Sequence, residues 1–294
     1  MVLASLAGDS LALGAHWIYD TDLLSKEIGR VEQLLPPLPH SYHATKKRGE
    51  VTHYGDQALM LCESIARNKA FILQGFSRDW QHLFSSYTGY MDQATEQTLK
   101  NFAAGAPPKK SGSDSADLGG ASRIAPLVYC YRNDLKKLIF FTRQQTVMTH
   151  TAPSAVAAAD FLARLSFAVL HDTPPAEAVC NTLEQGVSDI NLSVKLREAL
   201  ESGEENSCEV IARLGQRCSA EEALPGAVHL IIKYPDDLQT ALIENTMAGG
   251  DSAARGLAVG MVLGAHLGMK HIPGDWLNAL RQYDHITSIL RNIP

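Results

Sequence analysis

An apolar stretch near the end of the chain, Gly256-Leu-Ala-Val-Gly-Met-Val-Leu-Gly-Ala-His-Leu-Gly268, constrains the fold most strongly. Its four glycines recur every four residues, so they follow one slowly drifting stripe along an α-helix. Another backbone can pack closely against such a stripe. The run is too short for a membrane span and is bounded by Asp251, Arg255, His266 and Lys270. It therefore predicts a buried helix within a soluble protein.

The segment before this helix, 245–256, sets the carboxylate of Asp251 directly behind a Gly249-Gly250 pair. Glycines reach backbone conformations closed to other residues, and Asp251 and Ser252 are favourable N-cap residues. The free N–H groups at a helix start attract anions and metal-bound phosphates. Two interpretations are open at this point: a ligand site, or an acidic cap on a helix that only packs.

Helical periodicity continues through nearly the whole sequence, and no run of alternating β-branched residues predicts a sheet. The Ala-rich run after Pro153 is apolar nearly all round, which is typical of a helix at the centre of a bundle. Other helices are expected at about 2–17, 54–68, 80–103, 120–131, 135–149, 174–186, 194–202, 207–215, 220–233 and 236–247. The stretches 35–48 and 105–118 are predicted to be loops, the second one mobile. No linker or repeat divides the chain, so we expect one all-α domain over residues 1–294.

Charge and cysteine usage exclude several classes of protein. The net charge of −6 argues against a general nucleic-acid binder, which needs a positive surface. The five cysteines are scattered and never in a Cys-x-x-Cys spacing, which indicates reduced thiols. The apolar start has no basic leader and is interrupted by Asp9, unlike a secretory signal. We expect a cytoplasmic protein that binds neither nucleic acid nor membranes.

Four polar segments carry the candidate chemistry. They are Gly8-Asp9-Ser10 with His16-Trp17, His53-Tyr-Gly-Asp56-Gln57, Gly119-Gly-Ala-Ser-Arg123 and Gly249-Gly-Asp251. Taken singly, each has an ordinary structural interpretation as a cap, a surface carboxylate or a core histidine. Their order along the chain is more specific than their individual chemistry.

Together these segments resemble the ADP-ribosylglycohydrolase family. Gly8-Asp9-Ser10-Leu11 resembles its opening Gly-Asp-Ala-Leu segment, and residues 118–127 resemble its central Asn-Gly-Ala-x-x-Arg-x-x-Pro segment. Thr149-His150-x-x-Pro153 fits the pattern, and Gly249-Gly250-Asp251 resembles the start of its final Gly-Gly-Asp-Thr-Asp-Thr segment. The resemblance implies an orthogonal multi-helix bundle that hydrolyses the bond between ADP-ribose and an acceptor, with two Mg²⁺ ions in the cleft.

The sequence departs from this family where the metal ligands are expected. Mg²⁺ requires several hard oxygen ligands in near-octahedral geometry. The family's Thr-Asp-Asp-Thr segment is here Tyr54-Gly55-Asp56-Gln57, which keeps one carboxylate, and Ala253 and Ala254 replace the second aspartate and the threonine of the final segment. The acidic residue expected near the end of the first helix aligns with His16. Asp56 and Asp251 remain as metal ligands, which are too few for a two-magnesium centre.

Arg255 follows Asp251 by one helical turn and has two open interpretations. It could form an i, i+4 ion pair with Asp251. Alternatively, its fixed positive charge could lie near the vacated metal position and replace part of the electrostatic role of the ion, although it cannot activate water as a Lewis acid.

Two functions follow from the resemblance. The first is a divergent hydrolase of ADP-ribosyl or related nucleoside bonds, with Asp56 as a base or water-orienting group and His16 as an auxiliary acid or base. Its expected ligand contacts are Gly119, Gly120, Arg123, His150, Gly249, Gly250, Ser252 and Arg255. The alternative is a non-catalytic ligand-binding or structural protein similar to the eye-lens crystallins built on this fold, which the Gly-Ala-His-Trp-Ile-Tyr-Asp20 segment resembles. It would use the same glycines and Arg123 without activating water.

Overall fold

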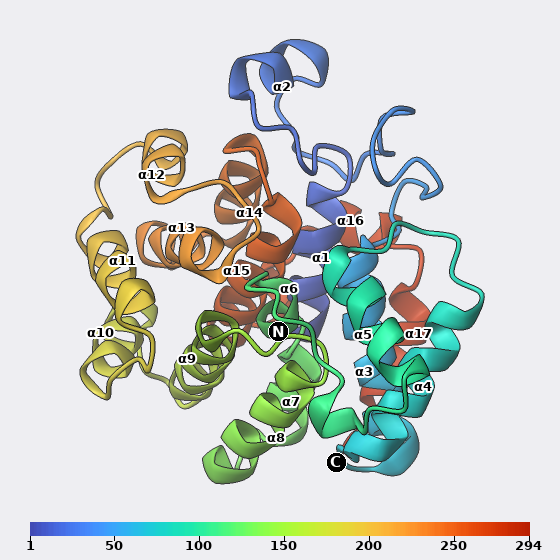
Figure 1. Ribbon diagram of the computed structural model, residues 1–294. Coiled ribbons are helices and arrows are strands. Elements are labelled where there is room, and N and C mark those ends of the chain that lie inside the picture. Colours follow the sequence, from blue (N-terminus) through green and yellow to red (C-terminus); the bar gives the residue numbers. More distant parts are fainter.

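The two helices that face each other at the centre of the bundle are α1 (Val2–Ala12) and α15 (Ser252–Leu267) (Figure 1). The computed structural model describes residues 1–294 and contains α-helices, short 3-10 helices and no β-strand. The remaining helices are α2 Thr21–Glu27, α3 His53–Asn68, α4 Leu73–Ser85, α5 Gln93–Ala103, η1 Pro108–Lys110, α6 Gly119–Ser122, α7 Ala125–Cys130, α8 Leu135–Val147, α9 Pro153–Leu170, α10 Pro175–Glu184, α11 Ile190–Glu201, α12 Ser207–Leu214, α13 Ala220–Lys233, α14 Leu238–Met247, η2 Met269–His271, α16 Gly274–Ala279 and α17 Tyr283–Leu290. The predicted all-α fold class is confirmed.

The glycine stripe makes the close approach of α1 and α15 possible. A Cβ added at Gly256 would lie 2.8 Å from the carbonyl oxygen of Gly8, and one added at Gly260 would lie 2.3 Å from that of Ala4. Both distances are shorter than real Cβ contacts, so only glycine fits there. Gly268 differs from the other three, because it adopts φ +77 and ends the helix.

Three predicted helices are interrupted. The first helix ends at Ala12 rather than near Trp17, because Trp17 turns back with φ +65 and donates its N–H to the carbonyl of Gly250 at 2.9 Å. The expected helix 80–103 is two helices, α4 and α5, and Asp92 caps the second by accepting the N–H of Thr95 at 2.6 Å. The expected helix 120–131 breaks between α6 and α7.

The segment 105–118 is tied down rather than free. Ser113 donates its N–H to the carbonyl of Thr149 at 3.0 Å, and Thr151 donates back to the carbonyl of Ser113 at 2.8 Å. Leu118 donates to the carbonyl of Cys218 at 2.8 Å. These contacts hold the segment between α5 and the Cys218 loop, where it forms one wall of a cleft.

The core includes α9, as the apolar pattern predicts. Ala155, Phe161 and Leu165 are fully buried on this helix, and one continuous cluster of buried apolar residues runs from Val2 to Ile293. By length and composition alone, α9 could cross a membrane, but most of it is buried within the bundle. All five cysteines are free thiols.

Candidate functional site

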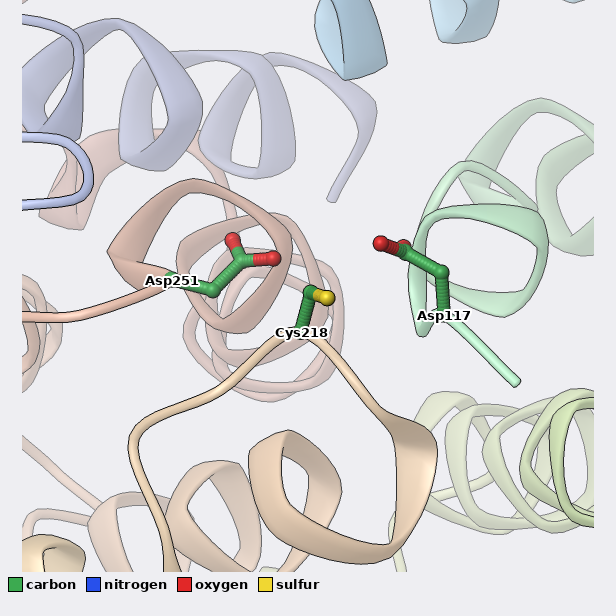
Figure 2. A group of neighbouring side chains, drawn as sticks. All are labelled: Asp117, Cys218 and Asp251. Carbon is green, nitrogen blue, oxygen red and sulfur yellow. The ribbon is translucent and has the colours of Figure 1, made fainter. Parts of the chain in front are cut away.

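Two buried carboxylates meet at one tyrosine hydroxyl. The Oη of Tyr54 lies 3.0 Å from Oδ2 of Asp117 and 3.1 Å from Oδ2 of Asp251. The thiol of Cys218 completes the group, in which one oxygen of each carboxylate and the sulfur all lie within 4.8 Å of one another (Figure 2). Four segments that are distant in the sequence therefore converge on one point.

Local backbone geometry orients the carboxylates of Asp117 and Asp251 towards Tyr54. Gly249 and Gly250 adopt φ +68 and +65, and the turn that they form is held by N–H donation from Gly250 to the carbonyl of Ile18 and from Asp251 to that of Gln216, both 2.8 Å. Asp251 then caps α15, since its Oδ1 accepts the N–H of Ala254 at 3.1 Å. This leaves its second oxygen directed at Tyr54.

Asp117 is placed in the same way at the start of α6. Its Oδ1 accepts the N–H of Gly119 at 2.6 Å, and its Oδ2 faces Tyr54. Gly119 must be glycine, because a Cβ there would lie 2.3 Å from the ring of Tyr54. Gly120 makes similar room for the ring of His150, 2.7 Å from its missing Cβ. The glycine pair that was expected to contact a ligand thus lets two side chains pack under the site.

Burial dominates the electrostatics of the carboxylate pair. It raises the pKa of Asp117 to about 7, and the neighbouring charges of Asp251 and Asp92 act in the same direction. Burial also raises the pKa of Asp251, against the opposing effects of the Ala254 N–H and the Arg255 charge. Near neutral pH the pair therefore shares a proton, and Asp117 is its better carrier because it faces two other carboxylates.

The remaining members of the cluster stay uncharged. Burial, followed by the two carboxylates, raises the pKa of the Tyr54 hydroxyl well above its usual value. Burial and the same carboxylates raise the pKa of the Cys218 thiol. A protonated thiol is neither a good nucleophile nor a good metal ligand.

A stack of imidazole rings forms a second wall next to the pair. The rings of His16 and His53 each lie 5.3 Å from the ring of His43, measured between centroids, and Trp17 stacks on His16 at 4.3 Å. His16 Nδ1 accepts the N–H of Ala253 at 3.4 Å and lies 3.8 Å from Oδ1 of Asp251. The three imidazole rings are buried, and Nε2 of His16 and both ring nitrogens of His43 have no hydrogen-bond partner.

The histidines differ in charge. Burial, with smaller effects from His43 and His53, lowers the pKa of His16 well below its usual value, so His16 is neutral with its proton on Nε2. Burial also lowers the pKa of His43 to about 3. For His53 burial acts in the same direction, but Asp92, whose Oδ2 lies 3.2 Å from Nε2, outweighs it and raises the pKa overall.

A polar cleft of about 520 Å³ reaches Asp117 from the surface. Its walls are α5, the segment 112–117 and the Cys218–Ser219 turn. Asp117 lines this cleft, whereas Asp251 is fully buried behind it. A ligand entering the cleft would meet Asp117 first.

Asp56 is not part of this cluster. It pairs with the ammonium of Lys46 and accepts the hydroxyl of Tyr87. Two residues along a helix correspond to a rotation of about 200°, so Asp56 and Tyr54 project from different faces of α3. Tyr54, rather than Asp56, is the residue of this segment that meets Asp251.

The two expected ligand arginines bind oxygens of the protein, although Nη1 of Arg255 is buried without a hydrogen-bond partner. Arg123 is fully buried, and its three nitrogens donate to Gln57, Gln145 and Thr149. Arg255 does not form the i, i+4 ion pair with Asp251. It donates to Oδ1 of Asn245 at 3.1 Å and to the carbonyl of Gly249, which braces the Gly-Gly turn from below.

Two further expected contacts keep free polar atoms. Ser252 is fully buried and its Oγ has no hydrogen-bond partner. His150 bonds through Nδ1 to Thr149 Oγ1 at 2.8 Å, while its Nε2 has none. Both residues could still contribute to binding.

Three residues of the cluster were not predicted as site residues from the sequence: Tyr54, Asp117 and Cys218. Asp117 and Asp251 share one sequence feature, an aspartate close to a Gly-Gly pair. Asp117 stands two residues before Gly119-Gly120, and Asp251 directly follows Gly249-Gly250. Cys218 carries no such signal. It lies in a turn between α12 and α13 whose position depends on the folded chain.

The donor set does not fit two Mg²⁺ ions. A Cβ at Gly55 would lie 2.4 Å from Cβ of Val51 and 2.7 Å from Oδ1 of Asp9, so no carboxylate can be placed there. Both carboxylate oxygens of Asp9 are already used, since they accept hydrogen bonds from the N–H and the hydroxyl of Thr52, both at 2.6 Å. The cluster offers two carboxylates and an uncharged thiol, whereas Mg²⁺ requires an oxygen shell.

Comparison with known proteins gives the family. The model of the ADP-ribosylglycohydrolase family matches residues 1–293, and the chain belongs to this family. Crystallin J1A and Crystallin J1B of Tripedalia cystophora are 22% and 23% identical to it, and in each case the match covers 94% of this chain and 89% of the relative. An uncharacterised protein of Archaeoglobus fulgidus is 23% identical, over 98% of this chain and 92% of that protein.

A solved structure described as an "ADP-ribosylglycohydrolase-related protein complex" has the same fold. It superimposes with a TM-score of 0.78 at 22% identity, over 99% of this chain and 94% of that one. At this identity the likeness concerns the fold alone.

Proposed function

We propose that this protein hydrolyses a glycosidic bond by means of the Asp117 and Asp251 pair, without a metal ion. The observation that carries the proposal is the position of Tyr54 Oη within 3.1 Å of both carboxylates. Two acids that share a proton supply a general acid and a general base at the same pH. Glycoside hydrolysis requires this combination.

The roles follow from the surroundings of each carboxylate. Asp117 lines the cleft and holds the proton, so it protonates the leaving atom as the bond to the anomeric carbon breaks. Asp251 accepts a proton from the water whose oxygen forms the new bond to that carbon. This water enters on the same face of the sugar after the leaving group departs, because two carboxylates this close leave no room for a water on the opposite face. Asp117 ends ionised and Asp251 protonated, and the Tyr54 hydroxyl between them provides the route by which the proton returns.

His16 supports the site without exchanging a proton. Its Nδ1 lies 3.8 Å from Oδ1 of Asp251, so the neutral ring forms the wall beside this carboxylate. Asp56 has no catalytic role in this scheme, because Lys46 and Tyr87 already bind it.

The test is turnover by the full-length protein in EDTA on uncharged ribosides and on ADP-ribosylated peptides, compared with Asp117→Asn. We expect hydrolysis of at least one class of glycoside, lowered about 100-fold or more in the variant because a general acid contributes roughly 10²–10⁴-fold. Asp284→Asn, on α17, is the matched control and should behave as wild type. Activity that survives Asp117→Asn but disappears in Asp56→Asn would contradict the proposal.

A non-catalytic role is the second candidate, and the two crystallin relatives favour it. It predicts ligand binding, or high stability alone, with no turnover of any glycoside. The same assay separates the two functions, because a structural protein would show no difference between wild type and Asp117→Asn.

A further inference from the structure

The cleft that leads to Asp117 contains no positively charged side chain. Its walls carry the amides of Gln93, Gln97 and Asn101 and the hydroxyls of three serines. The ionisable groups on its lining are the carboxyls of Asp114 and Asp117 and the thiol of Cys218. A diphosphate entering this cleft would meet acidic groups and no counter-charge.

The buried and partly buried cations close to the site are bound within the protein, and Arg217, which precedes the Cys218–Ser219 wall, is exposed and is not part of the cleft lining. Arg123 and Arg255 are fully buried and donate to protein oxygens, Lys46 is paired with Asp56, and His53 is paired with Asp92. Freeing any of them would leave a buried polar group unpaired. Such a change costs about 1–3 kcal/mol or more when the group is charged.

Several backbone N–H groups along the cleft wall are also occupied. In the cleft wall, the N–H of Ser115 donates to Ser113 Oγ at 3.3 Å and that of Asp117 to Ser115 Oγ at 3.2 Å. The N–H groups of Ser113, Leu118 and Gly119 donate within the protein as well.

The helix starts that could attract an anion already carry carboxylates of the chain. Asp92 caps α5, and Asp251 caps α15. A phosphate near either start would meet a carboxylate in place of the free N–H groups that anions favour.

These features suit an uncharged sugar. Amides and hydroxyls pair with sugar hydroxyls at no electrostatic cost. The rings of Trp17, Tyr42 and Tyr90, whose centroids lie 5.0–5.3 Å apart, gather beside His53 outside the lining of this cleft. We propose that the site takes an uncharged glycoside of the nucleoside type rather than an ADP-ribosyl group, an inference that rests on the proposed function.

Binding of three probes that differ in charge tests the inference. Adenosine, AMP and ADP-ribose are titrated into the full-length Asp117→Asn protein, and into wild type at low temperature in case the variant folds poorly. We expect affinity to fall in that order, with adenosine binding at least 10-fold more tightly than ADP-ribose at low salt and by a smaller factor at 0.5 M salt. Equal or tighter binding of ADP-ribose, or no binding of adenosine, overturns the inference.

A charge variant adds a second readout. Asp114→Asn should raise the affinity for ADP-ribose relative to adenosine several-fold, whereas Asp284→Asn should leave the ratio unchanged. An unchanged ratio in Asp114→Asn counts against the inference.

Turnover separates this inference from the function on which it rests. Adenosine that binds while no riboside is hydrolysed contradicts the hydrolase alone. Hydrolysis of ADP-ribosylated peptides but of no uncharged riboside contradicts the substrate class alone.

Discussion

Tyr54→Phe removes a single oxygen atom from between two buried carboxylates, and its effect on stability should depend strongly on pH. The hydroxyl lies 3.0 and 3.1 Å from the two acceptors, and all three side chains are buried. A hydrogen bond to a charged group contributes about 1.5–3 kcal/mol, so we expect a loss of about 2 kcal/mol where the pair is ionised.

The pH dependence follows from the proton shared by the pair. Burial holds the pKa of Asp117 at about 7, and removal of a donor raises it further. An acid whose folded-state pKa is raised destabilises the fold progressively as pH increases from its unfolded value towards the folded one. The loss of about 2 kcal/mol should therefore be present at pH 8 and fall below about 1 kcal/mol at pH 5, where Asp117 holds its proton.

Urea unfolding at both pH values measures this difference. Tyr90→Phe is the matched control, because no hydrogen bond of its hydroxyl connects it to the pair, and it should lower stability equally and slightly at both pH values. An equal loss at pH 5 and pH 8 in Tyr54→Phe, or no loss at either, would refute the shared-proton reasoning.

Three further perturbations test other parts of the account. Burial raises the pKa of Asp9 to about 7 despite the two hydrogen bonds from Thr52, so the stability of the wild type should fall as pH rises from about 4 to 7. In Asp9→Asn the unfolding free energy should lose this pH dependence, which amounts to up to about 4 kcal/mol over that window. Gly260→Ala should cost about 3 kcal/mol in urea unfolding, since its Cβ would lie 2.3 Å from a backbone oxygen of α1, whereas Gly274→Ala, which meets nothing within 4 Å, should cost little. Calorimetric titration with Mg²⁺ should show no tight two-ion binding; two sites of micromolar affinity would contradict the degraded metal centre.

Much of the fold was predictable because its signals are local. The apolar stretches of α9 and α15 and the spacing of Gly256, Gly260 and Gly264 depend on neighbouring residues alone, and all these features pack as expected. The predicted helix boundaries were wrong where contacts between residues distant in the sequence determine the structure. Residues 13–17 leave the helix because Trp17 bonds to Gly250, more than two hundred residues away.

In the candidate site, too, local features were predictable and contacts between distant segments were not. The Gly249-Gly250-Asp251 turn is evident in the sequence because glycines in the left-handed region and an N-cap residue are local signals. The partners of Asp251 are not, since Tyr54 reaches it through the packing of α3 and Asp117 through the segment before α6, which is held by the Cys218 loop. Asp56 was predicted in place of Tyr54 because a carboxylate can act as a base or a metal ligand. Which face of α3 contacts Asp251 cannot be predicted from the sequence of this segment alone.

The most direct test of the central claim is the protonation state of the Asp117 and Asp251 pair, measured by ¹³C NMR titration of protein labelled at its aspartate carboxyl carbons. The account predicts two carboxyls that titrate near pH 7, because burial raises the pKa of both Asp9 and Asp117 to about 7, and the signal that tests the pair is that of Asp117. This signal should be absent in Asp117→Asn and should move to lower pH in Asp251→Asn, where the neighbouring charge is removed. If the carboxyls of Asp117 and Asp251 instead both titrate below pH 5, they do not share a proton at neutral pH, and the proposed acid–base pair is wrong.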